Sequence, residues 1–469
     1  MRSRHGSARA EISASLWGTV VLLTDMLPPR VRYGYVHRLT RAVLATPLRR
    51  LEAPRDTGPV LPDPASPVAA GAGSTTCVLA ADGLDIGGIG TVIEMLARGL
   101  GEHSVRPVVL CHGDGARAAR LRDAGVEVRT VRDEDAALEV IRGIAPDVIQ
   151  SHSAPPFLER AALRSGVPLV PVMHNTEIHY TRARWAAFAE LMAGSAAAIA
   201  VSETVREFHL RHIGEGTPIR VVPNGAPTAA TPTAAERKSA RDALSAVLGV
   251  DLGDDVVFVT LARYDAQKNF AGLVAGAADE IAASPAPIRL VCAGDPSDSA
   301  EWRRTDALRR AGRAADRIHL LGNSDARALL TAADAFVLDS FFEGWPVAAT
   351  EAAAFGHPLL LADVGGAREL VARDPDRSVL IANATGAASL VSDRRVRAAR
   401  RRSRRQANAP ALRAAMAAIT RTVVAERSAP VGSDPRAHVD RATVRTMLAQ
   451  HAEIVRAAAS TVRDGQGAR

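Results

Sequence analysis

The sequence contains few cysteines and few aromatic residues. Among its 469 residues there are three cysteines, Cys77, Cys111 and Cys292, and aromatic residues make up 4% of the chain. Each cysteine lies in a short apolar run typical of a buried strand, and none has the spacing of a metal site or a CxxC redox pair. Buried thiols without a disulfide framework indicate a reducing compartment, so we expect the protein in the cytoplasm.

The sequence also lacks a convincing secretory signal. The segment MRSRHGSAR is basic and LWGTVVLL is apolar, but no small-residue cleavage site follows and Asp25 ends the run. The apolar run is too short to cross a bilayer. We therefore expect neither a cleaved leader nor a spanning helix in this segment.

The segment that follows is basic and periodic. Residues 30–51, RVRYGYVHRLTRAVLATPLRRL, place apolar residues at roughly helical spacing among arginines. This pattern is typical of a basic amphipathic helix. Two interpretations stay open: the helix lies on an anionic membrane surface, or it docks on the body of the protein.

A second basic segment lies near the C-terminus, where eight arginines occur between Arg394 and Arg405. Such a block is usually a solvated face or a flexible arm, although it can also attract phosphates, nucleic acid or anionic lipid. No zinc finger, helix-turn-helix element or aromatic RNA-binding motif accompanies it. We therefore expect no nucleic-acid partner.

The length and the apolar runs indicate two α/β domains. Seven short apolar runs between residues 75 and 225 mostly alternate with helix-like stretches, and six more occur between residues 256 and 383. Strands that alternate with helices favour a parallel sheet covered on both faces. We expect two doubly wound domains that face each other across a cleft.

The predicted organisation has five segments. They are an N-terminal extension at 1–72 with the basic helix and a Pro/Ala-rich linker, a first Rossmann-like domain at 73–226, a second linker at 227–239, a second Rossmann-like domain at 240–392, and an Arg/Ala-rich tail at 393–469 with a helix candidate at 438–460.

Ligands of doubly wound domains bind beyond the carboxyl ends of the strands. In the first domain, Gly87 and Gly88 follow a strand in the sequence LDIGGIG and can offer backbone N–H groups to a phosphate. Their spacing differs from the dinucleotide fingerprint GxGxxG, and the alternative is a tight strand-to-helix turn. His174 follows another strand; a lone histidine is more often structural, but this position favours a functional one.

In the second domain, Arg263 and Lys268 follow the first strand in the sequence LARYDAQKNF. Two cations in a loop that opens a helix suit a diphosphate. The alternative is a surface loop with ordinary charges.

Two carboxylates, Glu343 and Glu351, lie eight positions apart in FFEGWPVAATEAAAFG. Pro346 suits the first turn of a helix and Gly356 suits its end, so we expect Glu343 in a loop and Glu351 one to two turns into the helix. This placement does not favour an acid/base dyad. A carboxylate can instead hold a vicinal diol such as the ribose hydroxyls, and the loop backbone can bind further polar atoms.

In their order along the chain, these segments resemble the retaining GT-B glycosyltransferases of family 4, also called glycosyl transferases group 1. The most specific element is the E-x7-E pair of Glu343 and Glu351, supported by GGIG, DVIQSHS, HN, AVSETVREFH, VVPNG, RYDAQKN, LLGN and VGGAREL. The resemblance spans both domains, over residues 75–390. It implies a GT-B fold of two Rossmann-like domains facing across a cleft, with a helical C-terminal tail.

The resemblance also implies a role for each candidate. Glu351 would bind the ribose diol, Glu343 a hydroxyl of the donor sugar, Arg263 and Lys268 the diphosphate, and the backbone around Leu321 the base. The implied catalytic residues are His174, Arg263, Lys268 and Glu343; the implied donor-binding residues are Gly87, Gly88, Arg263, Lys268, Leu321, Glu343, Gly344, Trp345, Pro346, Val347 and Glu351.

The function implied is transfer of a sugar from a UDP- or GDP-sugar to a hydroxyl acceptor, with retention of configuration and without a metal or cofactor. A lipid-linked acceptor, cell-surface polysaccharide or glycolipid biosynthesis and a peripheral location at the inner face of the plasma membrane are expected. Two alternatives stay open: a nucleotide-sugar epimerase on the same fold, and a non-catalytic nucleotide-binding homologue.

Overall fold

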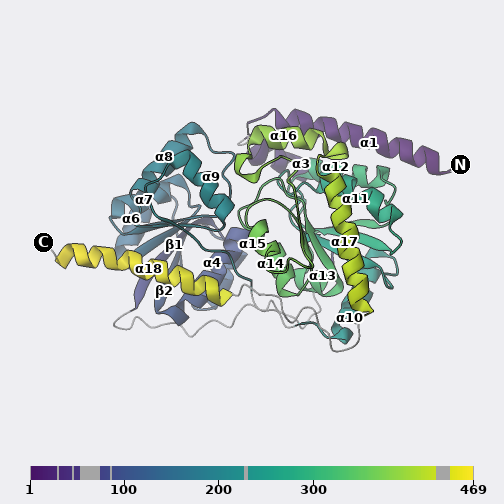
Figure 1. The fold of residues 1–469 in the computed structure, drawn as a ribbon. Coiled ribbons are helices and arrows are strands. Elements are labelled where there is room, and N and C mark those ends of the chain that lie inside the picture. Colours follow the sequence, from purple (N-terminus) through teal and green to yellow (C-terminus); the bar gives the residue numbers. More distant parts are fainter. Residues whose placement is uncertain are drawn as a thin grey trace. The chain divides into compact units, whose positions relative to one another are not determined.

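The computed structural model describes residues 2–28, 31–44, 47–52, 74–84, 87–226, 231–428 and 444–467. The chain forms two compact units whose members are not contiguous in sequence. The first domain holds strands β1–β7 with their helices and the C-terminal helix α18. The second domain holds β8–β13 with their helices and the N-terminal helices (Figure 1).

The first domain is built on a seven-stranded parallel sheet with the order β3-β2-β1-β4-β5-β6-β7. Its strands are β1 (Thr75–Gly83), β2 (Val105–Gly113), β3 (Glu127–Thr130), β4 (Val148–His152), β5 (Leu169–Met173), β6 (Ala198–Ala200) and β7 (Ile219–Val221). The central strands β4 and β5 are buried along their whole length, as parallel strands covered on both faces must be.

Helices connect successive strands of this sheet. They are α4 (Gly88–Gly99), η2 (Leu100–His103), α5 (Ala116–Asp123), α6 (Glu134–Ile144), α7 (Pro156–Ser165), α8 (Arg182–Ala193) and α9 (Glu203–Ile213). Helix α18 (Val444–Gly467) returns from the C-terminus and packs on the same domain, where Arg220 pairs with Glu453 at 2.6 Å. Gly99 admits this helix closely, because a Cβ atom there would clash with the side chain of Leu448.

The second domain repeats the architecture with a six-stranded parallel sheet of order β10-β9-β8-β11-β12-β13. Its strands are β8 (Val256–Leu261), β9 (Ile288–Ala293), β10 (Ile318–Leu321), β11 (Ala335–Leu338), β12 (Leu359–Ala362) and β13 (Val379–Ile381). Its helices are α10 (Ala234–Leu248), α11 (Phe270–Ala283), α12 (Ser299–Ala311), α13 (Ala326–Ala332), α14 (Val347–Ala354), α15 (Ala367–Val371), η3 (Ala388–Leu390), α16 (Asp393–Arg401), η4 (Ser403–Arg405) and α17 (Ala409–Arg427).

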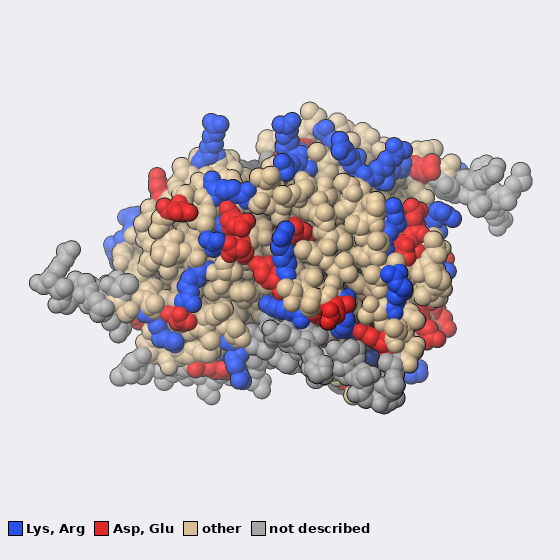
Figure 2. Space-filling view, viewed as in Figure 1, with Lys and Arg blue, Asp and Glu red and all other residues tan. Residues whose placement is uncertain are grey.

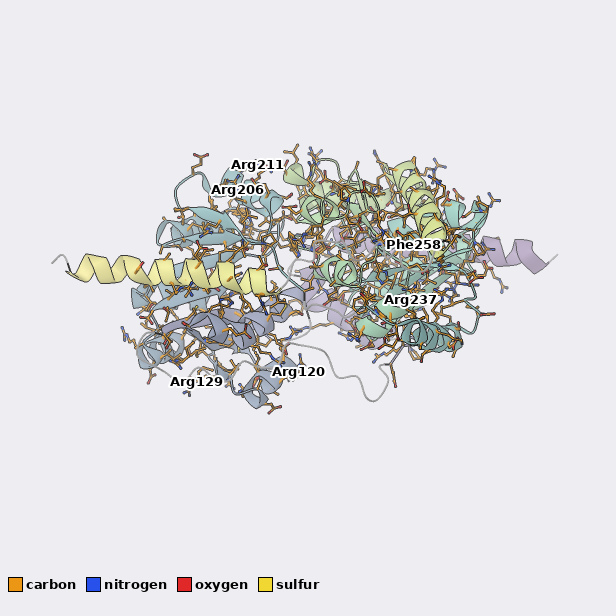
Figure 3. The ribbon with its side chains drawn as sticks, turned by 60° about the horizontal axis from the view of Figure 1, so that its bottom comes forward. Arg120, Arg129, Arg206, Arg211, Arg237 and Phe258 are labelled. Carbon is orange, nitrogen blue, oxygen red and sulfur yellow. The ribbon has the colours of Figure 1, made fainter. Side chains whose placement is uncertain are left out.

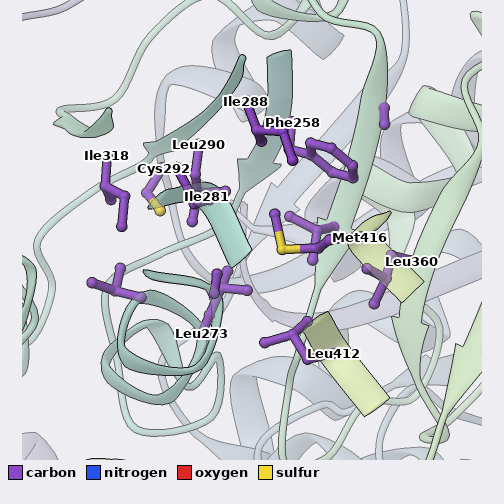
Figure 4. Packing of buried hydrophobic residues seen from close by; sticks show 14 of the residues in the cluster. Phe258, Leu273, Ile281, Ile288, Leu290, Cys292, Ile318, Leu360, Leu412 and Met416 are labelled. Atoms are coloured by element: carbon purple, nitrogen blue, oxygen red, sulfur yellow. The ribbon is translucent and has the colours of Figure 1, made fainter. Parts of the chain in front are cut away.

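The core of the second domain lies between the sheet and the helices α11 and α17 (Figure 4). Phe258 of β8 and Leu360 of β12 meet Leu412 and Met416 of α17 in one buried cluster. The helix of the tail is therefore part of this domain's core, because its apolar stripe covers the sheet.

The N-terminal segment packs on the second domain. It forms α1 (Arg2–Asp25), the π-helix η1 (Arg32–Val36) and α3 (His37–Leu44). Helix α1 packs along α12, and Ala14 of α1 contacts a small apolar cluster that includes Leu308. Beyond α3 the backbone carbonyl of Arg49 accepts a hydrogen bond from Gly322 N at 2.8 Å. The helix expected in residues 30–51 is thus formed over 31–44 and docks on the body of the protein.

A buried ionic network fixes α1 in place. Arg400 pairs with Glu301 of α12 at 2.8 Å and with Asp25 at the end of α1, and Asp25 also pairs with Arg32 at 2.6 Å. The expectation of a wholly solvated arginine block is therefore wrong for Arg400, which is 2% exposed because two carboxylates compensate its charge. Six of the eight arginines in that block are exposed.

Most elements agree with the sequence predictions. Each of the thirteen predicted apolar runs coincides with one of the thirteen strands described above, although β1 and β2 extend beyond their runs by one and two residues. Burial raises the pKa of the Cys77 thiol to about 12 and that of Cys111 to about 11, as expected for thiols inside a sheet. The helix predicted at 438–460 is confirmed from Val444 onward, and 438–443 lie outside the described residues.

The first predicted linker falls largely outside the described residues, at 53–73, whereas the second, at 227–239, falls outside them at 227–230 alone. Helix α10 begins at Ala234, inside the segment interpreted as the second linker. Thr233 and Glu236 form a reciprocal capping box there, which satisfies backbone N–H groups at the helix start. Across the described part of the chain, no helix combines the length and apolar character needed to cross a membrane.

Candidate active site

The strand order of the second domain reverses between the neighbouring strands β8 and β11. A loop leaves the carboxyl end of each: residues 262–269 follow β8, and residues 339–346 follow β11. The two loops are bonded together, since Phe341 N donates to the Gln267 carbonyl at 2.8 Å. In doubly wound folds this point of reversal is where ligands bind.

Lys268 and Glu343, one from each loop, form an ion pair. Lys268 Nζ lies 2.5 Å from Glu343 Oε1, and Gln267 Nε2 donates to Glu343 Oε2 at 3.3 Å. Both charged side chains are largely buried, at 16% and 6% exposed. The structure thus brings together two of the predicted site residues as mutual partners.

Arg263 lies in the same loop and presents its charge to solvent. Its side chain is 51% exposed, and Arg263 Nη2 lies 3.2 Å from Asp265 Oδ2. Asp265 also accepts the backbone N–H groups of Gln267 at 3.0 Å and Lys268 at 3.2 Å, which fixes the loop. Burial raises the pKa of Asp265, although Arg263 and Lys268 oppose that shift.

Glu351 lies in the second turn of α14 and is half-buried. Burial raises the pKa of its carboxyl group to about 7. Within the described residues, no side chain or N–H group donates a hydrogen bond to this carboxylate, in contrast to Glu343. A partly desolvated acid with unused acceptors is suited to a ligand that brings its own donors.

The ends of α14 agree with the sequence prediction. The loop residues Gly344, Trp345 and Pro346 directly precede the first helical residue, Val347. After the helix, Gly356 adopts a φ of 78°, which favours glycine, and donates its N–H to the Ala353 carbonyl at 2.8 Å.

Leu321 ends the edge strand β10 and is buried. Its carbonyl oxygen already accepts the Tyr264 hydroxyl at 2.9 Å. The next N–H group, of Gly322, donates to Arg49 in the N-terminal segment. A base held near this strand end would therefore lie beside residues of the N-terminal segment, which the sequence did not indicate.

One buried acid of this region was not among the site residues predicted from the sequence. Asp339, directly after β11, accepts hydrogen bonds from Asn269 Nδ2 at 3.0 Å, Gln406 Nε2 at 2.8 Å and Asn408 Nδ2 at 2.8 Å. Burial raises its pKa to about 6 despite these three donors. Two of these partners, Asn269 and Gln406, are 137 positions apart, so no local pattern could have indicated this loop-fixing role.

In the first domain, the glycine cluster opens a helix after β1 as expected. Gly88 is the first residue of α4 and Gly87 precedes it. In the described part of the chain, no side chain caps this helix start, so its first N–H groups keep their capacity for an anion. Asp85 and Ile86 lie outside the described residues.

His174 follows β5 and belongs to a stack of three histidines. Its Nε2 lies 2.9 Å from Nδ1 of His152, the last residue of β4. The ring of His451, from α18, stacks against His152 at 6.5 Å between centroids, and its Nδ1 lies 3.3 Å from Gln150 Oε1. His152 and His451 were not predicted as site residues, although His152 lies in the segment DVIQSHS at the end of a predicted strand.

These three histidines are buried and neutral at ordinary pH. Burial lowers the pKa of His174 to about 4 and that of His451 to about 3, and it lowers the pKa of His152 well below the usual value. The short contact between His152 and His174 therefore joins a donor nitrogen to an acceptor nitrogen, which fixes complementary tautomers.

Among the residues that the structure describes, no group of three or more histidine, cysteine or acidic side chains is arranged to hold a metal ion.

Both sheets match known protein families. Residues 86–230 match the family model described as Glycosyltransferase Family 4, and residues 254–393 match the one described as Glycosyl transferases group 1. The chain belongs to the GT-B glycosyltransferases. The two matches contain all the candidate residues named above, apart from the N-terminal segment and His451.

A bacterial protein shares part of this glycosyltransferase sequence. The protein named as teichuronic acid biosynthesis glycosyltransferase TuaC of Bacillus subtilis is 28% identical over 237 residues. The alignment covers 49% of this chain and 56% of the relative, so the chain matches little more than half of that protein's length.

Solved structures share the fold at low identity. HepE of Anabaena, in complex with UDP and glucose, is 16% identical with a TM-score of 0.59, covering 82% of this chain and 100% of that one. A glycosyltransferase of Rickettsia africae is 15% identical with a TM-score of 0.64, covering 82% and 98%. WaaG, involved in lipopolysaccharide biosynthesis, is 12% identical with a TM-score of 0.54, covering 81% and 99%. At these identities the comparison establishes the GT-B architecture alone.

Proposed function

We propose that this glycosyltransferase moves a sugar from a nucleoside-diphosphate sugar to a hydroxyl acceptor, with retention of configuration. The observation that carries the proposal is Glu351, a half-buried carboxylate without a partner in the described structure, on the helix that follows the point of strand reversal. A ribose diol would supply the two hydrogen bonds that this carboxylate can accept.

Arg263 and Lys268 are proposed to bind the diphosphate. The exposed guanidinium of Arg263 can form two parallel hydrogen bonds to phosphate oxygens, whereas Lys268 acts as a point charge oriented by Glu343. Glu343 keeps unused lone pairs beside Lys268, and these would accept a hydroxyl of the donor sugar. We propose no metal or cofactor, since these cations can neutralise the diphosphate themselves.

The rate enhancement would come from charge placed before the reaction starts. As the bond between the sugar and the diphosphate breaks, negative charge grows on the leaving oxygen. Fixed cations and backbone N–H groups stabilise that charge more in the transition state than in the ground state. Loss of one such group is expected to lower kcat about 100- to 1000-fold.

The first domain is proposed to act on the acceptor side and at the reactive face of the sugar. The N–H groups at the start of α4, near Gly87 and Gly88, suit an anionic group of either substrate. Neutral His174 can donate or accept one hydrogen bond without bringing charge, with its tautomer set by His152.

The donor and acceptor classes are proposed from the similar proteins. HepE has been solved with UDP and with UDP-glucose, and TuaC is named for teichuronic acid biosynthesis. We therefore propose a UDP-sugar ahead of a GDP-sugar, and an acceptor hydroxyl in cell-surface polysaccharide or glycolipid synthesis. A lipid-linked acceptor would place the enzyme at the inner face of the membrane.

A thermal-shift screen tests the donor site. The full chain is heated with UDP, GDP, ADP, dTDP and their common sugar conjugates, beside the Glu351→Gln variant and the control Glu139→Gln, which alters an exposed acid on α6. One nucleotide should raise the Tm of the wild type and of Glu139→Gln but not of Glu351→Gln. The absence of any shift would refute the donor site, and sugar isomerisation without an acceptor would favour an epimerase.

A further inference from the structure

Helix α1 carries apolar residues on two opposite faces. One face, with Ala10, Ala14 and Val21, is buried against the second domain. The other points away from it and is exposed, with Ile12 at 69%, Leu16 at 59% and Leu23 at 62%, and Met26, directly after the helix, is 75% exposed. These four positions recur at helical spacing and form a stripe along the helix.

The segment η1–α3 continues this pattern. Tyr35, Leu39 and Val43, each four positions apart, are 71%, 66% and 79% exposed. The opposite side of α3 faces α12, where His37 Nε2 lies 3.1 Å from Asp298 Oδ2. Both N-terminal helices thus pack on α12 and turn large apolar side chains away from it. We call these seven exposed residues the outer stripe.

Arginines border the outer stripe. The block α16–η4 lies against α1, where Arg397 Nη1 donates to the Asp25 carbonyl at 3.1 Å and Arg404 Nη2 donates to the Glu11 carbonyl at 3.4 Å. Six arginines of this block are exposed, and Arg38 and Arg41 on α3 are exposed as well. Figure 2 shows basic side chains gathered along the upper edge of the second domain, over the elements that Figure 1 labels α16 and α1.

The part of the outer stripe on α1 is anchored to the second domain. The buried pairs of Asp25 with Arg32 and of Arg400 with Glu301 tie the end of α1 to α12 and α16. Helix α1 already has a packing surface, because its inner face is buried against the second domain. The apolar residues on its outer face are therefore exposed in addition to that surface. Soluble surfaces rarely expose contiguous apolar patches of this kind without a partner.

We propose that the outer stripe docks on an anionic lipid bilayer, with α1 and α3 lying in the plane of the headgroups. Apolar side chains beside a cluster of arginines match the chemistry of such an interface, where acyl chains lie beneath anionic headgroups. A second copy of the chain fits less well, since its own arginines would repel those of the first copy.

This surface goes beyond the proposed transfer of sugar. The outer stripe lies on helices outside both matched family domains. It is tested by binding to vesicles, whereas the donor site is tested by binding of nucleotides. Failure of the transferase proposal would leave it intact, and failure of vesicle binding would leave the donor site intact.

Co-sedimentation of the full chain with vesicles tests the proposal. Vesicles of phosphatidylcholine mixed with phosphatidylglycerol should bind the protein, and vesicles of phosphatidylcholine alone should bind it much more weakly. Leu16→Gln and Leu23→Gln should each weaken binding about tenfold, the effect of withholding one buried leucine from the acyl region. Val424→Gln on α17 replaces an exposed apolar residue outside the stripe and should change nothing.

A second pair of variants tests the charge. Arg401→Gln with Arg402→Gln should weaken binding to the anionic vesicles by about fivefold for each charge removed. The matched control replaces Arg142 and Arg211, two exposed arginines of the first domain, of which Arg211 is labelled on α9 in Figure 3. All these side chains are exposed, so an unchanged Tm verifies that each variant is folded.

Three outcomes would overturn the proposal. Absence of binding to anionic vesicles is the first. Loss of binding in the arginine variants but not in the leucine variants would mean simple charge adsorption rather than docking of the stripe. A dimer in solution that Leu23→Gln dissociates, with unchanged vesicle binding, would make a second copy the occupant.

Discussion

At the scale of single residues, three carboxylates near β11 differ in the groups that stabilise their negative charge. Glu343 has a lysine, Asp339 has three amide donors, and Glu351 has neither among the described residues. The sequence placed Glu343 and Glu351 correctly on a loop and a helix. It did not distinguish a paired acid from an unpaired one, because pairing depends on residues of another loop.

The pH dependence of stability should reveal Glu351. Its pKa rises from 4.5 to about 7 on folding, so the folded state binds a proton more tightly than the unfolded state. The stability from this group is fully present below pH 4.5 and is lost as pH rises to about 7. Glu351→Gln should remove this fall, as measured by urea denaturation of the nucleotide-free protein across that range. If Glu351→Gln and the wild type had the same pH profile of stability, the Glu351 carboxylate would be solvated in the folded protein.

A double-mutant cycle should measure the coupling between Lys268 and Glu343. Lys268→Met leaves a buried carboxylate without its cation and should destabilise the protein by about 3 kcal/mol. Adding Glu343→Gln should recover most of that loss without restoring sugar transfer.

Arg263→Gln is the matched control for this cycle, because it removes a half-exposed cation from the same loop. It should change the free energy of unfolding by less than about 0.5 kcal/mol. A stable Lys268→Met variant would contradict the buried geometry of the pair.

At the scale of elements, the strands were predictable and the partners of the terminal helices were not. Each short apolar run bounded by turns specifies a buried parallel strand by itself, so β1–β13 could be found from local pattern. Helix α1 has apolar residues on two faces, so periodicity alone gives no single inner side. Arg400 looked like one more surface arginine, and its burial depends on Asp25 and Glu301, which lie far away in sequence.

The attachment of α1 should depend on Asp25. Asp25→Ala leaves Arg400 and Arg32 without a shared carboxylate in a buried site, which should cost about 3 kcal/mol and loosen the helix. Hydrogen exchange should rise across residues 8–25 and stay unchanged in α4 of the first domain. Glu11→Ala, an exposed acid on the same helix, serves as the control. Equal exchange in both variants would argue against the network.

At the scale of the whole molecule, buried acids and buried bases respond to acid in opposite ways. The pKa of His174 falls to about 4 and that of His451 to about 3 on folding, so the unfolded state binds protons more tightly. This contribution is present above pH 6.5 and is lost as pH falls toward 3, the reverse of the response of Glu351. The difference arises because burial penalises the charged form of both acids and bases.

A variant of the histidine stack should change that acid response. His451→Gln removes one buried base from α18 and should make unfolding of the first domain less sensitive to pH between 6.5 and 3. Circular dichroism in urea across that range would measure it, with His103→Gln, on η2 of the same domain, as the control. A parallel change in the control would show that acid acts elsewhere.

The network around Arg400 limits the order in which parts of this protein can fold during synthesis. Asp25 and Arg400 are separated by 375 positions, so the first helix leaves the ribosome long before its partner exists. The first domain can collapse in the meantime, since its sheet needs only residues up to 226. Throughout that interval both apolar faces of α1 are uncovered, and a nearby bilayer would meet the nascent chain before the second domain does.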